Sequence, residues 1–205
     1  LGWIDPFETW TYVSATPFTT PGDKTGKYSP GDKIRIFNGS TKYAYILTSS
    51  FGAGVTTINI IGNALAAGAI TANYYSRIAN PLLFPHWFDY TPTLAGFSAD
   101  PTSSIYRFML VGTKVTVVVR QAAAGTSNAT TFTITAPITS KTIANMVWGT
   151  ATWSHEDNTV ALTTPGRAFI GSASNVITIG KDSANSANWT NSGGKRTNFT
   201  LEYEI

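Results

Sequence analysis

Apolar and polar residues alternate along short segments of this chain, a pattern typical of strands with one buried face. In residues 33–37 (KIRIF) and 42–49 (KYAYILTS), apolar or aromatic side chains recur at every second position, and Asn38-Gly39 lies between the two segments. This arrangement predicts a β-hairpin, because Asn-Gly favours the tight turns that join neighbouring strands. With similar runs at 9–14 and 55–61, the N-terminal part is expected to form a small closed or nearly closed barrel.

From residue 104 onward the same alternation returns, and no helical pattern interrupts it. It predicts about eight strands over roughly a hundred residues, separated by turns rich in Gly, Pro and Asn. We therefore expect a two-sheet sandwich of the jelly-roll type, with a Greek-key immunoglobulin-like order as the alternative, because spacing does not reveal strand order. The expected strands are 104–111, 114–120, 130–136, 141–148, 151–154, 159–164, 167–173, 175–181 and 196–205.

The last of these segments is strongly amphipathic. Phe199, Leu201 and Tyr203 share one face, whereas Glu202 and Glu204 share the other. Since an unpaired strand of this kind would be an exposed edge, we expect it to pair within the sheet or across a subunit interface.

An aromatic, proline-punctuated segment separates the two strand-rich regions. This aromatic segment, residues 74–92, resembles neither a regular helix nor a strand, and before it residues 63–72 favour a turn or short helix at most. We predict an N-terminal barrel-like domain over 1–73, a connecting segment over 74–95 and a jelly-roll sandwich over 96–205. The aromatic segment is interpreted as a rigid clamp between domains or subunits, formed by Tyr74, Tyr75, Phe84, Trp87, Phe88 and Tyr90.

Composition narrows the classes of function. Hydrophobic residues make up 42% of the 205 residues and charged residues only 12%, so a large core and a surface of Thr, Ser, Asn and Gly are expected. A net charge of +3 without a dense basic face argues against nucleic-acid binding. No apolar run approaches the roughly 20 residues that would predict membrane insertion. The first residue is Leu1 rather than Met, which fits a processed product or part of a longer chain.

Catalytic, metal and cofactor sites are not predicted. The chain has no Cys and only two His, and neither His86 nor His155 lies in a nucleophile motif. The run His155-Glu156-Asp157 is interpreted as a solvated turn, because adjacent residues of an extended segment point to opposite faces and cannot share a metal. Glu202 and Glu204 could form the two-carboxylate pair of a glycosidase, but a charged outer strand face is the favoured interpretation.

Two tryptophans near predicted loops, Trp153 and Trp189, are the candidates for surface recognition. Exposed indole rings there could stack on the rings of a glycan. The competing interpretation is that both are buried in the core or in an interface.

Several longer segments carry a resemblance to a known family. They are WTYVSATPFTTPGDKTGKYSPGDKI, AITANYYSRIANPLLFPHWFDYTPT, NATTFTITAPITSKTI and WTNSGGKRTNFTLEYEI. Together they resemble a module of tailed-bacteriophage and prophage virion proteins, of the tail-fibre or minor structural kind, and the resemblance covers most of the chain.

The resemblance implies a homo-oligomer, most often a trimer, located on the tail or capsid surface of the virion and in contact with other virion proteins. It also implies a small N-terminal barrel followed by a jelly roll, and no catalytic residues. The leading hypothesis is a receptor-binding module whose C-terminal loops contact a host-surface glycan or protein. A capsid decoration or head-fibre protein is the first alternative, and a polysaccharide depolymerase that uses Glu202 and Glu204 is the second.

Overall fold

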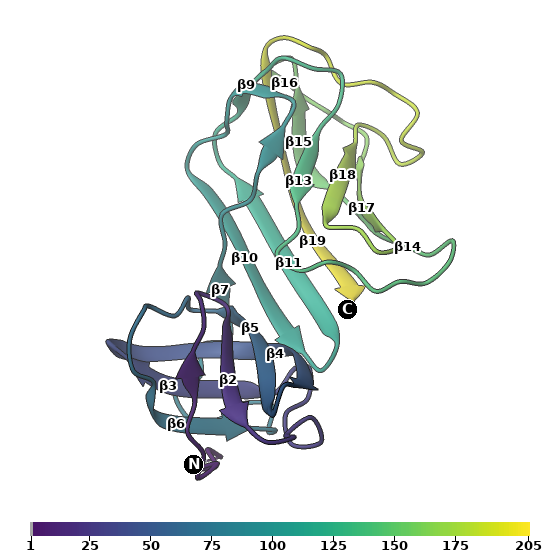
Figure 1. Ribbon diagram of the computed structural model, residues 1–205. Coiled ribbons are helices and arrows are strands. Elements are labelled where there is room, and N and C mark those ends of the chain that lie inside the picture. Colours follow the sequence, from purple (N-terminus) through teal and green to yellow (C-terminus); the bar gives the residue numbers. More distant parts are fainter. Residues whose placement is uncertain (1) are drawn as a thin grey trace. The chain divides into compact units, whose positions relative to one another are not determined.

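The computed structural model describes residues 2–205, and the chain divides into two compact units. Unit 1 comprises Leu1–Phe88 and Leu110–Thr113, and unit 2 comprises Asp89–Met109 and Lys114–Ile205. Both units are built from β-strands (Figure 1). The described residues contain no α-helix, and so none long and apolar enough to cross a membrane. The predicted all-β fold class is confirmed.

Unit 1 is a six-stranded sheet in the order β1-β2-β5-β4-β3-β6. Its strands are β1 (Thr11–Tyr12), β2 (Pro17–Pro21), β3 (Lys33–Asn38), β4 (Ser40–Gly52), β5 (Val55–Gly62) and β6 (Thr71–Ser76). The predicted hairpin at Asn38-Gly39 is confirmed, because Asn38 pairs with Ser40. Gly39 has a φ of 72°, in the left-handed region that glycine adopts without strain.

The N-terminal segment links the two edges of this sheet and makes unit 1 barrel-like. Ile4 exchanges backbone hydrogen bonds of 2.9 and 3.0 Å with Tyr75 of the edge strand β6, and the same segment continues into β1 at the opposite edge. Inside, Trp10 stacks on Phe18 with ring centroids 4.4 Å apart and meets the edge of Tyr28. These large rings fill a core to which several strands contribute isoleucines.

One local prediction for this unit is wrong. The aromatic segment does contain a strand at its start, since Tyr74 and Tyr75 belong to β6 and pair with Arg35 and Ile34 of β3. Pairing with β3 decides this outcome, because partner strands override weak local propensity. Before β6, where the sequence predicts a turn or short helix at most over 63–72, the backbone is irregular up to Thr71.

Other aromatic residues of the same segment pack inside unit 1. Phe84 lies against Tyr45 with ring centroids 5.0 Å apart, and Phe88 lies 5.4 Å from the same ring. Phe84 and Phe88 are buried, and Trp87 is half-buried. These residues therefore serve the core of unit 1, while their role as a clamp stays a prediction.

Unit 2 is a sandwich of two sheets. One sheet has eight strands, with the path β16-β15-β19-β11-β10-β7 and with β12 pairing both β19 and β9. Its strands are β7 (Phe88–Asp89), β9 (Phe97–Ala99), β10 (Ser104–Val111), β11 (Lys114–Gln121), β12 (Gly125–Ser127), β15 (Trp153–Asp157), β16 (Val160–Ala161) and β19 (Gly194–Glu204). Near its start, Tyr90 packs edge-on against Tyr106 and Phe108.

The second sheet has five strands in the order β14-β17-β18-β13-β8. They are β8 (Leu94–Ala95), β13 (Thr133–Thr135), β14 (Val147–Ala151), β17 (Arg167–Gly171) and β18 (Val176–Gly180). Ile134, Ile170 and Ile177 of this sheet are fully buried, which marks its inner face. A two-sheet sandwich is thus the observed architecture of the C-terminal part.

The C-terminal strand occupies the interior of the larger sheet. β19 pairs with β11 on one side and with β15 on the other. Phe199, Leu201 and Tyr203 are no more than 1% exposed, and the Tyr203 hydroxyl donates a 2.7 Å hydrogen bond to the Ile138 carbonyl. The predicted burial of this face is confirmed, and the strand is paired within its own sheet.

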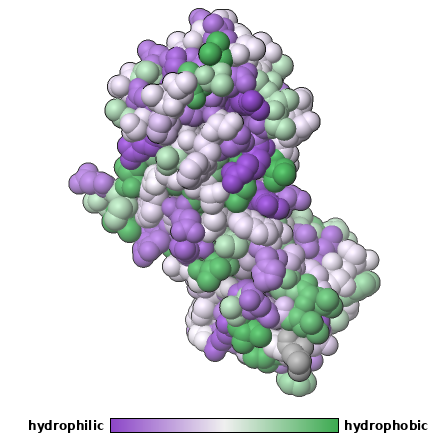
Figure 2. Space-filling view, turned by 180° about the vertical axis from the view of Figure 1, so that it is seen from behind, coloured by the Kyte–Doolittle hydropathy of each residue, from purple (hydrophilic) through white to green (hydrophobic). Residues whose placement is uncertain are grey.

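The surface is only weakly apolar. Most of the face seen in Figure 2 is pale, which marks residues of intermediate hydropathy such as Thr, Ser and Gly, with strongly hydrophilic and hydrophobic residues scattered between them. This agrees with the composition, in which only 12% of the residues are charged.

Candidate functional site

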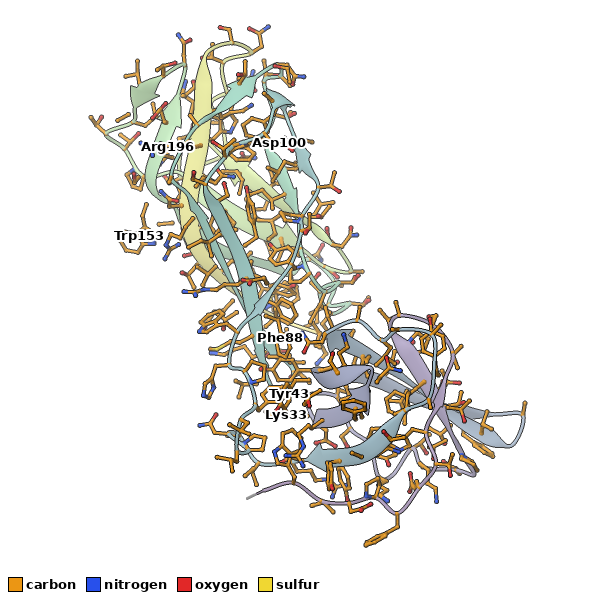
Figure 3. All side chains as sticks on the ribbon, turned by 90° about the vertical axis from the view of Figure 1, so that its left-hand side faces the viewer. Lys33, Tyr43, Phe88, Asp100, Trp153 and Arg196 are labelled. Carbon is orange, nitrogen blue, oxygen red and sulfur yellow. The ribbon has the colours of Figure 1, made fainter. Side chains whose placement is uncertain are left out.

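The two candidate tryptophans lie in opposite environments. Trp153 is 66% exposed, and Figure 3 shows its ring directed away from the sandwich. Trp189 is only 3% exposed, packs against Phe132 and donates a 2.7 Å hydrogen bond from Nε1 to the Ile179 carbonyl. The prediction of Trp189 as a surface-recognition residue is therefore wrong, because its ring and its only side-chain donor are both used inside unit 2.

A β-bulge gives Trp153 its outward direction. Trp153 pairs with Asn198 and Glu156 pairs with Arg196, so Ser154 and His155 lie opposite a single residue of β19. In a regular strand Trp153 would share the inward face of His155, two residues further along. The extra residue shifts this alternation, as bulges do, and both Trp153 and Ser154 face solvent while His155 is buried.

The local backbone supports this arrangement. Ser154 has a φ of 41°, an uncommon conformation for a residue with a side chain. Its carbonyl accepts a 3.2 Å hydrogen bond from Asn198 Nδ2, which bridges the disrupted part of the ladder. Such bulges recur beside binding sites because they re-aim a side chain without ending the strand.

Trp153 borders a pocket of about 250 Å³ on unit 2, which we call the Trp153 pocket. Its lining is rich in hydroxyl groups and consists of Thr152, Trp153, Ser154, His155, Leu162, Thr163, Thr164 and Pro165. The 162–165 segment is held against β15 by the Leu162 amide, which donates a 3.0 Å hydrogen bond to the His155 carbonyl.

This combination is chemically suited to a sugar ring. The indole face is apolar and carries the negative part of the ring quadrupole, so it attracts a flat face of polarised C–H groups. Hydroxyl side chains both donate and accept hydrogen bonds. A sugar ring offers C–H groups on its faces and hydroxyls around its rim, and the Trp153 pocket offers the matching groups.

Beneath the pocket, the side chains of β15 are anchored by polar contacts. His155 Nδ1 lies 3.2 Å from Thr152 Oγ1, and burial lowers the pKa of the imidazole even though a hydrogen bond with the Lys181 backbone opposes this. His155 is therefore neutral at pH 7 and serves as a hydrogen-bonding group. It also lies against Gly166, where an added Cβ would come 3.3 Å from Nε2.

Asp157 anchors the other end of the same strand. Its carboxylate forms a 2.6 Å ion pair with Lys181 and accepts hydrogen bonds from the Thr190 amide and hydroxyl. Burial opposes ionisation, but the contacts with Lys181 and Thr190 outweigh it and lower the pKa of Asp157. The interpretation of His155-Glu156-Asp157 as a solvated turn is wrong, although Glu156 does point to the opposite face, toward Arg196.

A buried lysine, missed in the sequence analysis, lies in the core of unit 2. Lys195 is 0% exposed, and its ammonium donates hydrogen bonds of 3.1 and 2.9 Å to the carbonyls of Ala129 and Thr131. The rings of Phe97 and Trp189 lie 5.0 and 5.8 Å from Nζ, within cation–π range. Lys195 shares the face of Phe199 in β19, so extending the predicted strand 196–205 back by one residue would have placed it on the buried face.

The structure gives no support to catalysis by the two C-terminal glutamates. Glu202 pairs with Lys114 at 3.0 Å and Glu204 with Lys141 at 3.8 Å, all with side chains about half exposed. Neither glutamate lines the Trp153 pocket, and both occupy the charged outer face expected of this strand.

A metal site is also unsupported in the part of the chain that the structure describes. Within residues 2–205, no three His, Cys, Asp or Glu side chains lie close enough together to hold a metal ion. His86, the other histidine, is exposed in unit 1.

Comparisons of this chain with protein families, with curated proteins and with solved structures found no match.

Proposed function

We propose that this chain is a non-enzymatic structural protein of a tailed-phage virion that binds host-surface carbohydrate through the Trp153 pocket. The observation that carries the binding role is the exposed Trp153 ring, turned outward by a bulge and bordered by hydroxyl side chains. The bulge that exposes this ring interrupts the ladder, an arrangement that is over-represented next to functional sites.

The virion setting rests on the resemblance of the sequence to tail-fibre and minor structural proteins. A homotrimer with its receptor-binding surface outermost is the assembly we propose. Large apolar side chains on the surface are consistent with partner contacts, since Phe7 is 91% exposed and Leu83 72%. Measuring the mass of the protein in solution tests the assembly directly, and a stable monomer at micromolar concentration would contradict it.

The binding role is tested with glycan arrays and adsorption to host cells. Loss of ring stacking in Trp153→Ala is expected to weaken binding by about 2 kcal/mol, or roughly 30-fold. Phe51→Ala is the matched control, because it removes a half-exposed aromatic ring from unit 1 and should leave binding unchanged.

Two results would speak against this function. Equal binding by Trp153→Ala and the wild type would exclude the Trp153 pocket as the site. If the intact protein bound neither glycans nor cells but microscopy located it on the heads of purified virions, the alternative of a capsid decoration protein would replace the proposal.

A further inference from the structure

A second pocket of about 420 Å³ adjoins the Trp153 pocket and shares Pro165 with it. Its lining is formed by Val147, Gly149, Thr150, Ala151, Pro165, Gly166, Arg167 and Ser183, and we call it the Arg167 pocket. The two pockets lie along one stretch of backbone, because Ala151 pairs with Arg167 and the Thr152 amide donates a 3.1 Å hydrogen bond to Gly166. From strand geometry, the Cα atoms of Trp153 and Arg167 lie within about 10 Å.

Arg167 is the only charged side chain in the lining of this pocket. Its guanidinium lies 4.8 Å from the Phe169 ring, yet across residues 2–205 it makes neither a hydrogen bond nor an ion pair. Arg196 of the same unit, by contrast, binds Glu156 at 3.0 Å. Stacking on Phe169 holds the guanidinium plane in place and leaves its N–H groups free for a ligand.

Neighbouring groups leave the charge of Arg167 uncompensated. The acid closest in sequence to the lining is Asp182, next to Ser183, but its carboxylate accepts hydrogen bonds from the backbone of Ser186 and Ala187. Those bonds turn it toward its own loop and lower its pKa. Gly149 leaves space for a ligand beside the Arg167 guanidinium, since a Cβ at this position would lie 3.1 Å from Arg167 Nε.

We propose that the Arg167 pocket binds the carboxylate of an acidic sugar, so that the ligand of this unit is an acidic rather than a neutral glycan. This inference rests on the proposed function, and it names the class of glycan. A guanidinium with free N–H groups forms paired, charge-assisted hydrogen bonds with a planar carboxylate. The net charge of +3 also favours the approach of a polyanion. Phosphate groups on a glycan share this chemistry.

The test uses the 205-residue chain and two probes with the same sugar rings, one charged and one neutral. Oligogalacturonate carries a carboxylate on every ring, and its methyl ester masks that charge on the same rings. We expect the wild type to bind the acid about tenfold more tightly than the ester at low salt, with the difference shrinking as salt increases. A pair of mannose and mannose 6-phosphate tests phosphate in the same way.

The variant Arg167→Gln should abolish this preference while retaining binding of the ester. Lys141→Gln is the matched control, because it removes one positive charge from the same unit outside both pockets and should preserve the preference. Equal binding of acid and ester by the wild type, or an unchanged preference in Arg167→Gln, would overturn the inference.

The failure of this inference can be told apart from failure of the proposed function. If neither probe nor any arrayed glycan binds, both are wrong. If the ester binds as well as the acid and Trp153→Ala abolishes both, carbohydrate binding stands and the acidic class is refuted. If Arg167→Gln abolishes binding of the acid but Trp153→Ala does not weaken it, the acid subsite stands and the role of Trp153 is refuted.

Discussion

Replacing the buried Lys195 with Met should remove a dependence of stability on pH that this one residue imposes. Burial lowers the pKa of Lys195 from 10.5 to about 8, and the negative charge of Asp157 only partly opposes it. In the unfolded chain the same ammonium is hydrated and titrates at its ordinary value. Between these two values the unfolded chain holds a proton that the folded chain has released, so the free energy of unfolding rises with pH.

The size of this effect follows from the two pKa values. Retaining the charged ammonium in the folded state at pH 7 costs about 3 kcal/mol relative to the neutral amine. Raising the pH from 7 to 9.5 should recover about 2 kcal/mol of that cost. Higher pH is avoided, because burial also raises the pKa values of Tyr90 and Tyr203. Above about pH 10 these tyrosines ionise in the unfolded chain but stay protonated in the folded chain, so the free energy of unfolding falls.

Urea unfolding of the wild type and of Lys195→Met at both pH values measures the difference. At pH 7 we expect the two to have similar stability, because removing the charge cost is offset by leaving the carbonyls of Ala129 and Thr131 without a donor. When the pH is raised from 7 to 9.5, the free energy of unfolding of the wild type should rise by about 2 kcal/mol more than that of Lys195→Met. Lys114→Met, which removes a lysine from a half-exposed site and keeps Lys195, is the control and should gain about the same 2 kcal/mol as the wild type.

Parallel pH profiles of the wild type and Lys195→Met would refute this account of the buried charge. A direct measurement covers the case in which the variant fails to fold. NMR of the side-chain resonances of labelled lysine in the wild type should show one lysine titrating near pH 8, and titration of every lysine above pH 10 would exclude the lowered pKa.

Three further perturbations test contacts within single units. Asp157→Asn should cost about 3 kcal/mol in urea unfolding because it leaves the Lys181 ammonium without its counter-charge, and an effect below 1 kcal/mol would contradict this. Gly166→Ala should destabilise unit 2 by about 1–3 kcal/mol, since its Cβ would lie 2.5 Å from the Gly180 carbonyl oxygen; unchanged stability would show that the backbone can yield. Burial opposes ionisation of Glu8, but hydrogen bonds from neighbouring side chains keep its pKa low, so stability should fall as the pH drops below about 4.5 and Glu8→Gln should flatten that decline.

Strands with a regular alternation could be predicted from the sequence. The segment 104–111 matches β10 at both ends, and the face of Phe199, Leu201 and Tyr203 is buried as expected. The Asn38-Gly39 hairpin follows from turn chemistry alone. In each case the information is local, because the period of two and the turn residues lie within a few positions of each other.

Features that depend on a distant partner could not be predicted. Trp189 is buried because its amide bonds to Thr130 and its indole to Ile179, contacts that the small-residue loop before it does not reveal. Tyr74 and Tyr75 become a strand only because β3 offers an edge to pair with. Lys195 breaks the rule that charges face solvent, and its carbonyl partners come from a loop more than sixty residues earlier.

The outward direction of Trp153 depends on both its local sequence and its distant partner β19. It also explains why mutations in unit 2 should be able to change glycan binding without changing stability, and the reverse. Its exposure depends on the bulge against β19, whereas the strand that carries it is anchored by His155 and by the ion pair of the buried Asp157 with Lys181. Those anchors are internal and involve no ligand. Trp153→Ala should therefore leave the free energy of unfolding within about 0.5 kcal/mol of the wild type while weakening glycan binding. Asp157→Asn should lower the free energy of unfolding but leave glycan binding unchanged as long as the protein stays folded, because Asp157 does not line the Trp153 pocket.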